Sequence, residues 1–259
     1  MAGALIGGLL ARGTAATELA VLEVDPAARA RLTARHGVQA SDAPRAVVGA
    51  AQVVVLAVKP QDMKAALAAL GPLEDRLVIS VAAGLRTATL SRWLGGHQRL
   101  VRCMPNTPAL IGCGISALYA APPVDADGRA SAEAILRAVG EVVWVDEERL
   151  LDPVTALSGS GPAYVFWFIE HLAAAGRALG LDEAVAQRLA LHTVLGAAQL
   201  AAQSGQAPAE LRRNVTSKGG TTEAALKVFD EEQLAERLAR ALKAASRRGA
   251  ALGDELGRD

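Results

Sequence analysis

Residues 53–81 read VVVLAVKPQDMKAALAALGPLEDRLVISV, and this stretch decides the fold. It opens and closes with short runs of Val, Ile and Leu, at 53–58 and 77–81, of the kind that form strands buried on both faces. Between them, residues 61–70 carry Ala and Leu at helical spacing. Strand, helix and strand in this order are typical of a parallel sheet whose strands are joined by crossover helices.

The same alternation fills the first half of the chain. Further strands are predicted at residues 19–24, 99–103, 115–119 and 142–145, and further helices at 26–36, 87–94 and 127–140. Repeated strand and helix indicate an α/β fold with a Rossmann-like, doubly wound sheet.

From about residue 147 the strand pattern stops. Helices are predicted at residues 162–179, 182–204, 208–213, 221–229 and 231–252, punctuated by glycines. We therefore expect an α/β domain over residues 1–146 and an all-α domain over residues 147–259. These helices are Ala-rich and apolar over much of their surface, which predicts a subunit interface; the alternative is a self-contained bundle.

The start of the chain lacks an expected element. A dinucleotide-binding sheet normally opens with a strand that runs into G-x-G-x-x-G, where the glycines let the backbone approach a pyrophosphate. Residues 1–13 read MAGALIGGLLARG, which is the pattern of the helix that follows such a loop. We expect a Rossmann-like sheet without its first strand, truncated at the N-terminus, and a reading frame that extends upstream of Met1.

Composition excludes several classes of protein. Apolar residues make up 51% of the chain, and 27 basic residues balance 27 acidic ones, which excludes disorder and argues against a nucleic-acid partner. Apolar stretches fall short of the roughly 20 residues that a membrane span needs. The only cysteines, Cys103 and Cys113, form neither a zinc motif nor a disulfide framework, so a cytoplasmic location is expected.

The reactive side chains are few. The four histidines are scattered without the spacing of metal ligands, and no G-x-S-x-G elbow is present, so no metal site is predicted. Hydride transfer from a nicotinamide is compatible with a chain that has few reactive side chains, because the cofactor carries the chemistry.

Three loops are candidates for a site. Residues 101–108 (VRCMPNTP) follow a strand, where open α/β sheets bind ligands, although Asn106 in a rigid turn that satisfies its own backbone is the alternative. Residues 215–222 (VTSKGGTT) offer hydroxyl and N–H donors at a helix N-terminus, suited to a carboxylate, or else a simple N-cap. Residues 157–164 (LSGSGPAY) indicate a hinge or a close approach to a cofactor ring.

These loops, in this order, resemble the pyrroline-5-carboxylate reductase family. The resemblance covers nearly the whole chain. It is carried by LAVKPQ at 56–61, VAAG at 81–84, RCMPNTP at 102–108, TALSGSGPAY at 155–164 and TSKGGTT at 216–222. It implies an oxidoreductase of proline biosynthesis that reduces pyrroline-5-carboxylate to L-proline with NADPH or NADH. It also implies a homodimer that forms through the helical domain and often assembles further.

The resemblance also implies the site residues. Those expected to bind the cofactor are Ala57, Val58, Lys59, Pro60, Ala82, Ala83, Gly84, Met104, Pro105 and Asn106. Those expected to bind the substrate are Ser217, Gly219, Gly220, Thr221 and Thr222. Thr222 is the expected catalytic residue, placed near the ring nitrogen.

Some residues depart from the family pattern. Lys218 stands where the family usually has proline, and Pro44 where an asparagine often serves the adenosine ribose. An acidic residue that closes the second strand, Asp25 or less favourably Glu23, can bond a ribose hydroxyl and repel a 2′-phosphate. Arg29 can counter that repulsion, and Asp25 can instead be an N-cap, so NADH and NADPH both stay open.

Two other functions are compatible with parts of the pattern. A Rossmann reductase of the 3-hydroxy-acid type would need a catalytic lysine on the first long helix of the second domain, and residues 164–179 contain none. An inactive oligomerising relative that lost cofactor binding is the alternative outside enzymes, suggested by the missing first strand.

Overall fold

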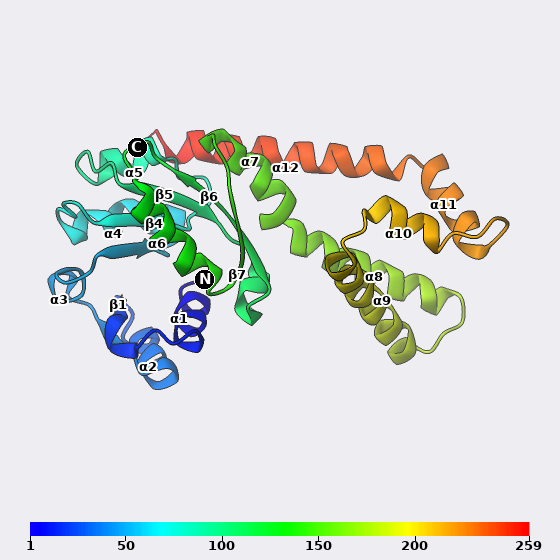
Figure 1. Ribbon diagram of the computed structural model, residues 1–259, viewed down its shortest axis with the longest axis horizontal. Helices are drawn as coiled ribbons and strands as arrows, with labels where there is room; N and C mark the ends of the chain where they lie inside the picture. The colour runs from blue at the N-terminus through cyan, green and yellow to red at the C-terminus, as the bar shows by residue number, and fades with distance from the viewer. Residues whose placement is uncertain (259) are drawn as a thin grey trace. The chain divides into compact units, whose positions relative to one another are not determined.

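The computed structural model describes residues 1–258, which form two compact units (Figure 1). The first comprises Met1–Ser160 together with the residues from Lys243 onward, and the second is Gly161–Leu242. The sequence places the boundary at residues 146 and 147 because the strand pattern stops there. The compact units instead divide after Ser160, because a connecting helical segment packs with the first unit.

The first unit is built on a five-stranded sheet in the order β3-β4-β5-β6-β7. Its strands are β3 (Val53–Leu56), β4 (Leu77–Ser80), β5 (Leu100–Met104), β6 (Gly114–Ala120) and β7 (Gly140–Trp144). Strands β3, β4 and β5 are parallel, whereas β6 runs antiparallel to β5 and parallel to β7. The sequence predicts all five, and it does not predict which pair is antiparallel.

Helices cover both faces of this sheet, which confirms the doubly wound, Rossmann-like fold. One buried cluster joins Ile79 and Val101 to Leu5 of α1 (Ala2–Ala11) and Leu136 of α6 (Ala126–Arg137). A second cluster on the other face includes Val78, with side chains of α4 (Met63–Leu70) and α5 (Thr87–Trp93). The pleat sends neighbouring residues of β4 to opposite faces, so each face has its own core.

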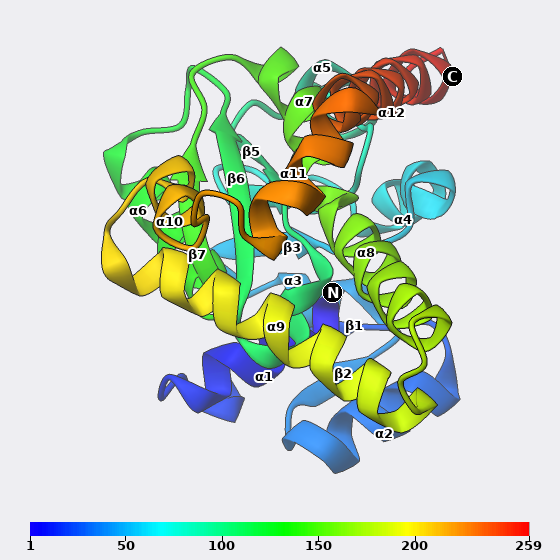
Figure 2. The same cartoon turned by 90° about the vertical axis from the view of Figure 1, so that its right-hand side faces the viewer.

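A second, smaller sheet lies apart from the first. Its parallel strands are β1 (Ala20–Leu22) and β2 (Gln39–Ser41), joined by α2 (Pro26–His36), and α3 (Pro44–Val48) leads on to β3. Figure 2 shows β3, β1 and β2 following one another downward from the middle of the picture. Within residues 1–258, no strand pairs with both β1 and β3 to join the two sheets.

The expectation that all strands are buried on both faces is therefore wrong for β1 and β3, and also for β7, where Val143 is 45% exposed. Two of the three residues of β1 are half-buried and one is exposed, and three of the four residues of β3 are half-buried. Each of these strands has one edge without a neighbouring strand to cover it. These uncovered edges lie where the chain forms two separate sheets.

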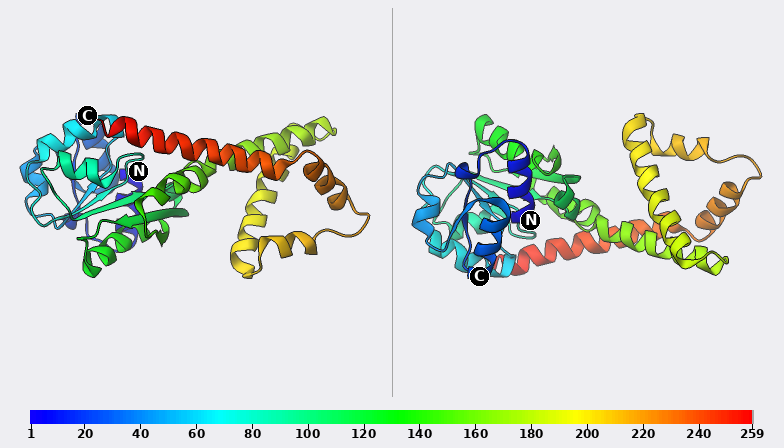
Figure 3. Two further views of the ribbon diagram at one scale, coloured as in Figure 1. Left: turned by 90° about the horizontal axis from the view of Figure 1, so that it is seen from above. Right: turned by 90° about the horizontal axis from the view of Figure 1, so that it is seen from below.

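The second unit is entirely helical, as predicted. It holds α8 (Gly161–Ala178), α9 (Glu183–Ser204), α10 (Pro208–Asn214), α11 (Thr221–Glu231) and the first part of α12 (Leu234–Leu256), which ends in the first unit (Figure 3). Helices α8 and α9 pack through small residues: a Cβ at Gly176 would lie 3.4 Å from that of Ala186. Asp182 caps α9 by accepting from the N–H of Ala184 at 2.9 Å.

Short helical turns complete the chain. They are the 3₁₀ turns η1 (Ala16–Glu18), η2 (Pro60–Asp62), η3 (Thr107–Ile111) and η4 (Glu148–Leu150), then α7 (Leu151–Val154) and the π-helical turn η5 (Thr155–Gly159). Turns η4, α7 and η5 form the segment that leads from the sheet to α8. The sequence indicates a hinge or a close approach to a cofactor ring at residues 157–164, and the structure has a wide helical turn that overlaps their start.

Candidate functional site

The three segments expected to bind the cofactor begin at one edge of the large sheet. Strands β3, β4 and β5 are parallel, so their carboxyl ends at Leu56, Ser80 and Met104 lie on the same side. In open α/β sheets, ligands bind beyond this edge. The structure thus brings together Ala57, Val58, Lys59, Pro60, Ala82, Ala83, Gly84, Met104, Pro105 and Asn106.

These loops carry small exposed residues beside the larger exposed side chains of Val58 and Lys59. Ala57 and Ala83 are exposed and small, so a flat ligand can approach the backbone beside them. Gly84 has a φ of 78°, a left-handed conformation that favours glycine. A Cβ there would also come within 3.3 Å of Leu256 Cδ1, at the end of α12. Gly84 therefore serves both the turn and the packing of the last helix.

The Asn106 side chain connects the loop after β5 to strand β6 through a hydrogen bond. Its Oδ1 accepts a hydrogen bond from the N–H of Ile115 in β6, at 3.0 Å. The sequence offered a turn in which Asn106 satisfies its own backbone, but the partner lies nine residues further along. The loop between β5 and β6 is thus closed on itself, with Met104 and Pro105 at its start.

A largely buried ion pair lies at β5, the strand that leads into this loop. Arg102 of β5 donates through Nη1 to Glu148 Oε1 at 2.9 Å, and the Arg102 side chain is only 7% exposed. The Glu148 carboxylate also accepts from the N–H and the hydroxyl of Thr87, at 2.6 and 2.8 Å. Three elements, β5, α5 and η4, therefore meet at one carboxylate. This cluster is not predictable from the sequence, because its partners lie far apart along the chain.

The substrate loop of the second unit is a tight turn ahead of α11. The N–H of Gly220 donates to the carbonyl of Ser217 at 3.0 Å, and Gly219 has a φ of 73°. Lys218 holds the second position of this turn, where proline is favoured. The N–H groups of Thr221 and Thr222 lie in the first turn of α11, where they have no partner within the helix.

Two contacts within this loop were not predicted. Glu223 Oε2 accepts from the N–H of Gly219 at 2.6 Å, so a carboxylate engages one donor of the loop. The hydroxyl of Thr216 donates back to the carbonyl of Arg212 at 2.6 Å, so this hydroxyl is bound to the last turn of α10. Glu223 is the third residue of α11, the position from which an acidic side chain commonly accepts from N–H groups at the start of the helix, as in a capping box.

The residues considered for the ribose lie at the end of β1. Asp25 accepts from the N–H of Ala27 at 2.9 Å, which confirms its role as the N-cap of α2. Arg29 donates to the carbonyl of Glu23 at 2.8 Å and forms an ion pair with Asp42 at 2.9 Å. Pro44 begins α3.

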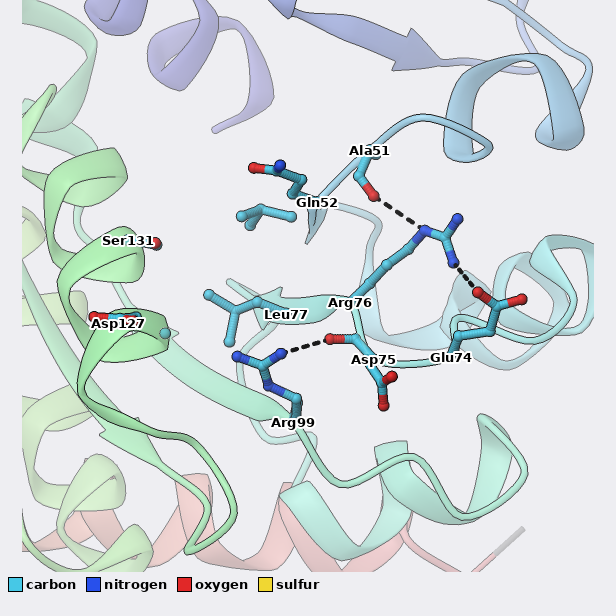
Figure 4. Close-up of a pocket in the computed structure, with 11 residues that line it drawn as sticks. Ala51, Gln52, Glu74, Asp75, Arg76, Leu77, Arg99, Asp127 and Ser131 are labelled. Carbon is cyan, nitrogen blue, oxygen red and sulfur yellow. Dashed lines mark hydrogen bonds and ion pairs between the residues drawn. The ribbon is translucent and has the colours of Figure 1, made fainter.

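A hollow lies at the opposite, amino-terminal end of the strands (Figure 4). It encloses about 440 Å³. Its two arginines are bound to main chain: Arg76 Nε donates to the carbonyl of Ala51 at 3.0 Å, and Arg99 Nη1 to that of Asp75 at 2.7 Å. These contacts tie neighbouring loops together and give the hollow no free cation for an anionic ligand.

No helix within residues 1–258 is long and apolar enough to cross a membrane. No three His, Cys, Asp or Glu side chains in that range gather as metal ligands would.

Comparison with known proteins gives matches at family level. Residues 148–252 match the profile described as pyrroline-5-carboxylate reductase dimerisation. Residues 1–84 match the profile described as NADP oxidoreductase, coenzyme F420-dependent.

Individual relatives match over nearly the full chain. Pyrroline-5-carboxylate reductase of Pseudomonas aeruginosa is 46% identical over 259 residues, which covers 99% of this chain and 95% of the relative. The solved structure of a pyrroline-5-carboxylate reductase from Coxiella burnetii is 40% identical with a TM-score of 0.92, covering 97% of this chain and 94% of the other. The Plasmodium falciparum enzyme, solved with NADP bound, is 26% identical with a TM-score of 0.84 at the same coverage.

Proposed function

The chain belongs to the pyrroline-5-carboxylate reductase family, and from this premise we propose how its own residues serve the reaction. It is an NAD(P)H-dependent oxidoreductase of proline biosynthesis that reduces pyrroline-5-carboxylate. The observation that carries this assignment is the likeness along the whole chain. The substrate is a cyclic imine with one carboxylate, and reduction to L-proline adds a hydride to carbon and a proton to nitrogen.

The first unit fits the nicotinamide cofactor at the carboxyl edge of its sheet. The small residues Ala57 and Ala83, with Gly84 in its left-handed turn, leave backbone accessible where a dinucleotide would lie. In our proposal residues 57–60 and 82–84 hold the cofactor, and residues 104–106 lie near the nicotinamide. NAD(P)H supplies the hydride when it is bound.

The turn before α11 is the proposed binding site for the substrate carboxylate. The N–H groups of Thr221 and Thr222 point out of the helix start, and the hydroxyl of Ser217 lies beside Gly220, where a Cβ would be 3.6 Å from it. Such a start, with its partial positive charge, favours an anion. Gly219 and Gly220 let the backbone approach closely, and Lys218 adds a cation.

Thr222 is the proposed catalytic residue. The ring nitrogen becomes more basic as the imine carbon is reduced, and a hydroxyl beside it can orient it and relay a proton, directly or through a water. Positioning of the two reactants supplies most of the rate, because no protein nucleophile is needed.

The test is reduction of pyrroline-5-carboxylate by the purified chain, followed by loss of NADPH absorbance. Thr222→Ala is expected to lower kcat by ~10 to 200-fold, the cost of about 1–3 kcal/mol for a lost hydrogen bond. Thr222→Ser keeps the hydroxyl and is the matched control, expected to retain most of the activity. An unchanged kcat in Thr222→Ala would remove Thr222 from the mechanism. No turnover by the unchanged chain would favour the inactive oligomerising relative.

The protein forms a homodimer, as the dimerisation profile over residues 148–252 implies. We propose in addition that the nicotinamide of one subunit faces the helical domain of the other, and that dimers assemble further. The functional domains are proposed as residues 1–146 and 147–259, and the location as the cytoplasm. The two free cysteines support a reducing compartment.

A further inference from the structure

The segment that leads into α8 contains a π-helical turn, Thr155–Gly159. The N–H of Ser160 donates to the carbonyl of Thr155 at 2.8 Å, five residues back, which is the wide spacing of a π-helix. Two hydroxyls hold the turn: Thr155 Oγ1 donates to the carbonyl of Leu151 at 2.6 Å, and Ser158 Oγ to that of Val154 at 3.2 Å. The backbone at Gly159 is therefore fixed from its own helix.

This turn brings Gly159 against the side chain of Met104. A Cβ added at Gly159 would overlap the terminal methyl Cε of Met104 and would lie 3.7 Å from its Cγ. The nearest other atom, Thr155 Cγ2, would be at 3.6 Å, an ordinary contact. Met104 alone therefore occupies the space that a side chain would need. Both residues belong to the first unit.

We propose that Gly159 is a positioning residue for the reduction, because its bare backbone sets where the Met104 side chain lies at the nicotinamide end of the cofactor site. This inference rests on the function proposed above, in which Met104 begins the loop near the nicotinamide. Met104 is half-buried, so part of its side chain faces outward from the sheet edge.

The chemistry makes this placement matter. A methionine side chain has three rotatable bonds and adapts to the space around it, so it keeps one position only where its neighbours impose one. Hydride transfer requires the reacting carbons at contact distance, and a misplacement of about 1 Å can cost roughly 100-fold in rate. A methyl group at Gly159 would push Met104 Cε away, and the far end of a flexible side chain is what would move.

The test compares Gly159→Ala with Gly7→Ala in α1. Neither glycine has a positive φ, and a Cβ at Gly7 would make only an ordinary contact, 3.5 Å from His36 Cε1, so the control adds the same methyl group to the same unit without the clash. Gly159→Ala is expected to lower kcat/KM for NADPH roughly 10 to 100-fold, mainly through kcat, because the geometry of hydride transfer is disturbed. KM for pyrroline-5-carboxylate should change less than about twofold. Gly7→Ala should keep wild-type constants. Equal constants in the two variants would overturn the proposal.

A double variant shows whether Met104 is the reason. Met104→Ala lowers activity by itself and removes the clashing atoms, so adding Gly159→Ala to it should cost less than about twofold further. Multiplied losses would mean that Gly159 acts through another contact. If Gly159→Ala fails to fold, folding of the double variant supports the proposal and failure of both overturns it. Turnover by the unchanged chain tests the proposed function separately, because the proposal concerns only ratios to it.

Discussion

Cys103 shows how burial controls the chemistry of a single residue. It lies in β5 and is 2% exposed, and burial raises the pKa of its thiol from the usual 9.0 to about 12, although a hydrogen bond with Ser116 partly opposes this. The thiolate is the reactive form of cysteine, so Cys103 is inert at neutral pH despite standing next to Met104. Its part is to fill the core beneath the site.

The raised pKa predicts a loss of stability in alkali. Above about pH 9 the unfolded chain releases the Cys103 proton while the folded chain retains it, so the free energy of unfolding falls as pH rises toward 12. The slope approaches about 1.4 kcal/mol per pH unit. Urea unfolding at about pH 8 and about pH 10, under reducing conditions, should show an extra loss of about 1 kcal/mol relative to Cys103→Ala.

Cys113→Ala is the matched control, because Cys113 is exposed. It should keep the pH dependence of the unchanged protein. The same pH dependence in Cys103→Ala as in the unchanged protein would show that other groups cause the loss.

At the residue scale, the sequence predicts side chains whose role is local. Asp25 before Pro26 is the N-cap of α2, and the glycines of the substrate loop form a turn ahead of α11. The contacts that were missed depend on three-dimensional placement. Gly159 meets Met104 only because a π-helical turn returns to the sheet edge, and Asn106 reaches Ile115 only because β6 runs antiparallel to β5.

At the scale of elements, periodicity predicts which segments are helices and strands but not how the strands pair. Helix α2 occupies residues 26–36 as predicted, because Asp25 and Gly37 mark its ends. The antiparallel β6 and the half-buried β1 and β3 were not predicted. Pairing and burial depend on neighbours distant in sequence, and a run such as VVVL at 53–56 reads alike in the centre or at the edge of a sheet.

The ion pair between Arg102 and Glu148 gives a prediction at this scale, because it joins β5, α5 and η4. Glu148→Ala leaves Arg102 buried without its partner and removes the contacts to Thr87, so the free energy of unfolding should fall by about 3 kcal/mol. Glu147→Ala is the neighbouring control, because Glu147 pairs with Arg149 at the surface, with side chains 54% and 71% exposed. It should cost less than about 1 kcal/mol. Denaturant unfolding measures both, and equal losses would contradict a structural role for the buried pair.

At the scale of the whole molecule, the helical unit exposes more apolar surface than a monomer would. Large apolar side chains of α8 and α9 are exposed, among them Phe166 at 64%, Trp167 at 58% and Leu189 at 54%. Large apolar side chains that gather on a surface are typical of interfaces. This unit lies within the stretch that matches the dimerisation profile, and we propose that the exposed apolar side chains of α8 and α9 belong to the dimer interface.

Phe166→Asp should therefore split the dimer. A buried, unpaired charge in an apolar interface costs several kcal/mol, enough to shift the equilibrium to monomer at micromolar concentration. Light scattering after gel filtration should give 26.6 kDa rather than a multiple of that mass. Val24→Asp changes an equally apolar side chain, 79% exposed after β1 in the other unit, and should stay dimeric. Activity should fall with the dimer, since each nicotinamide is proposed to face the partner's helical domain. A fully active Phe166→Asp monomer would mean that one chain holds a complete site.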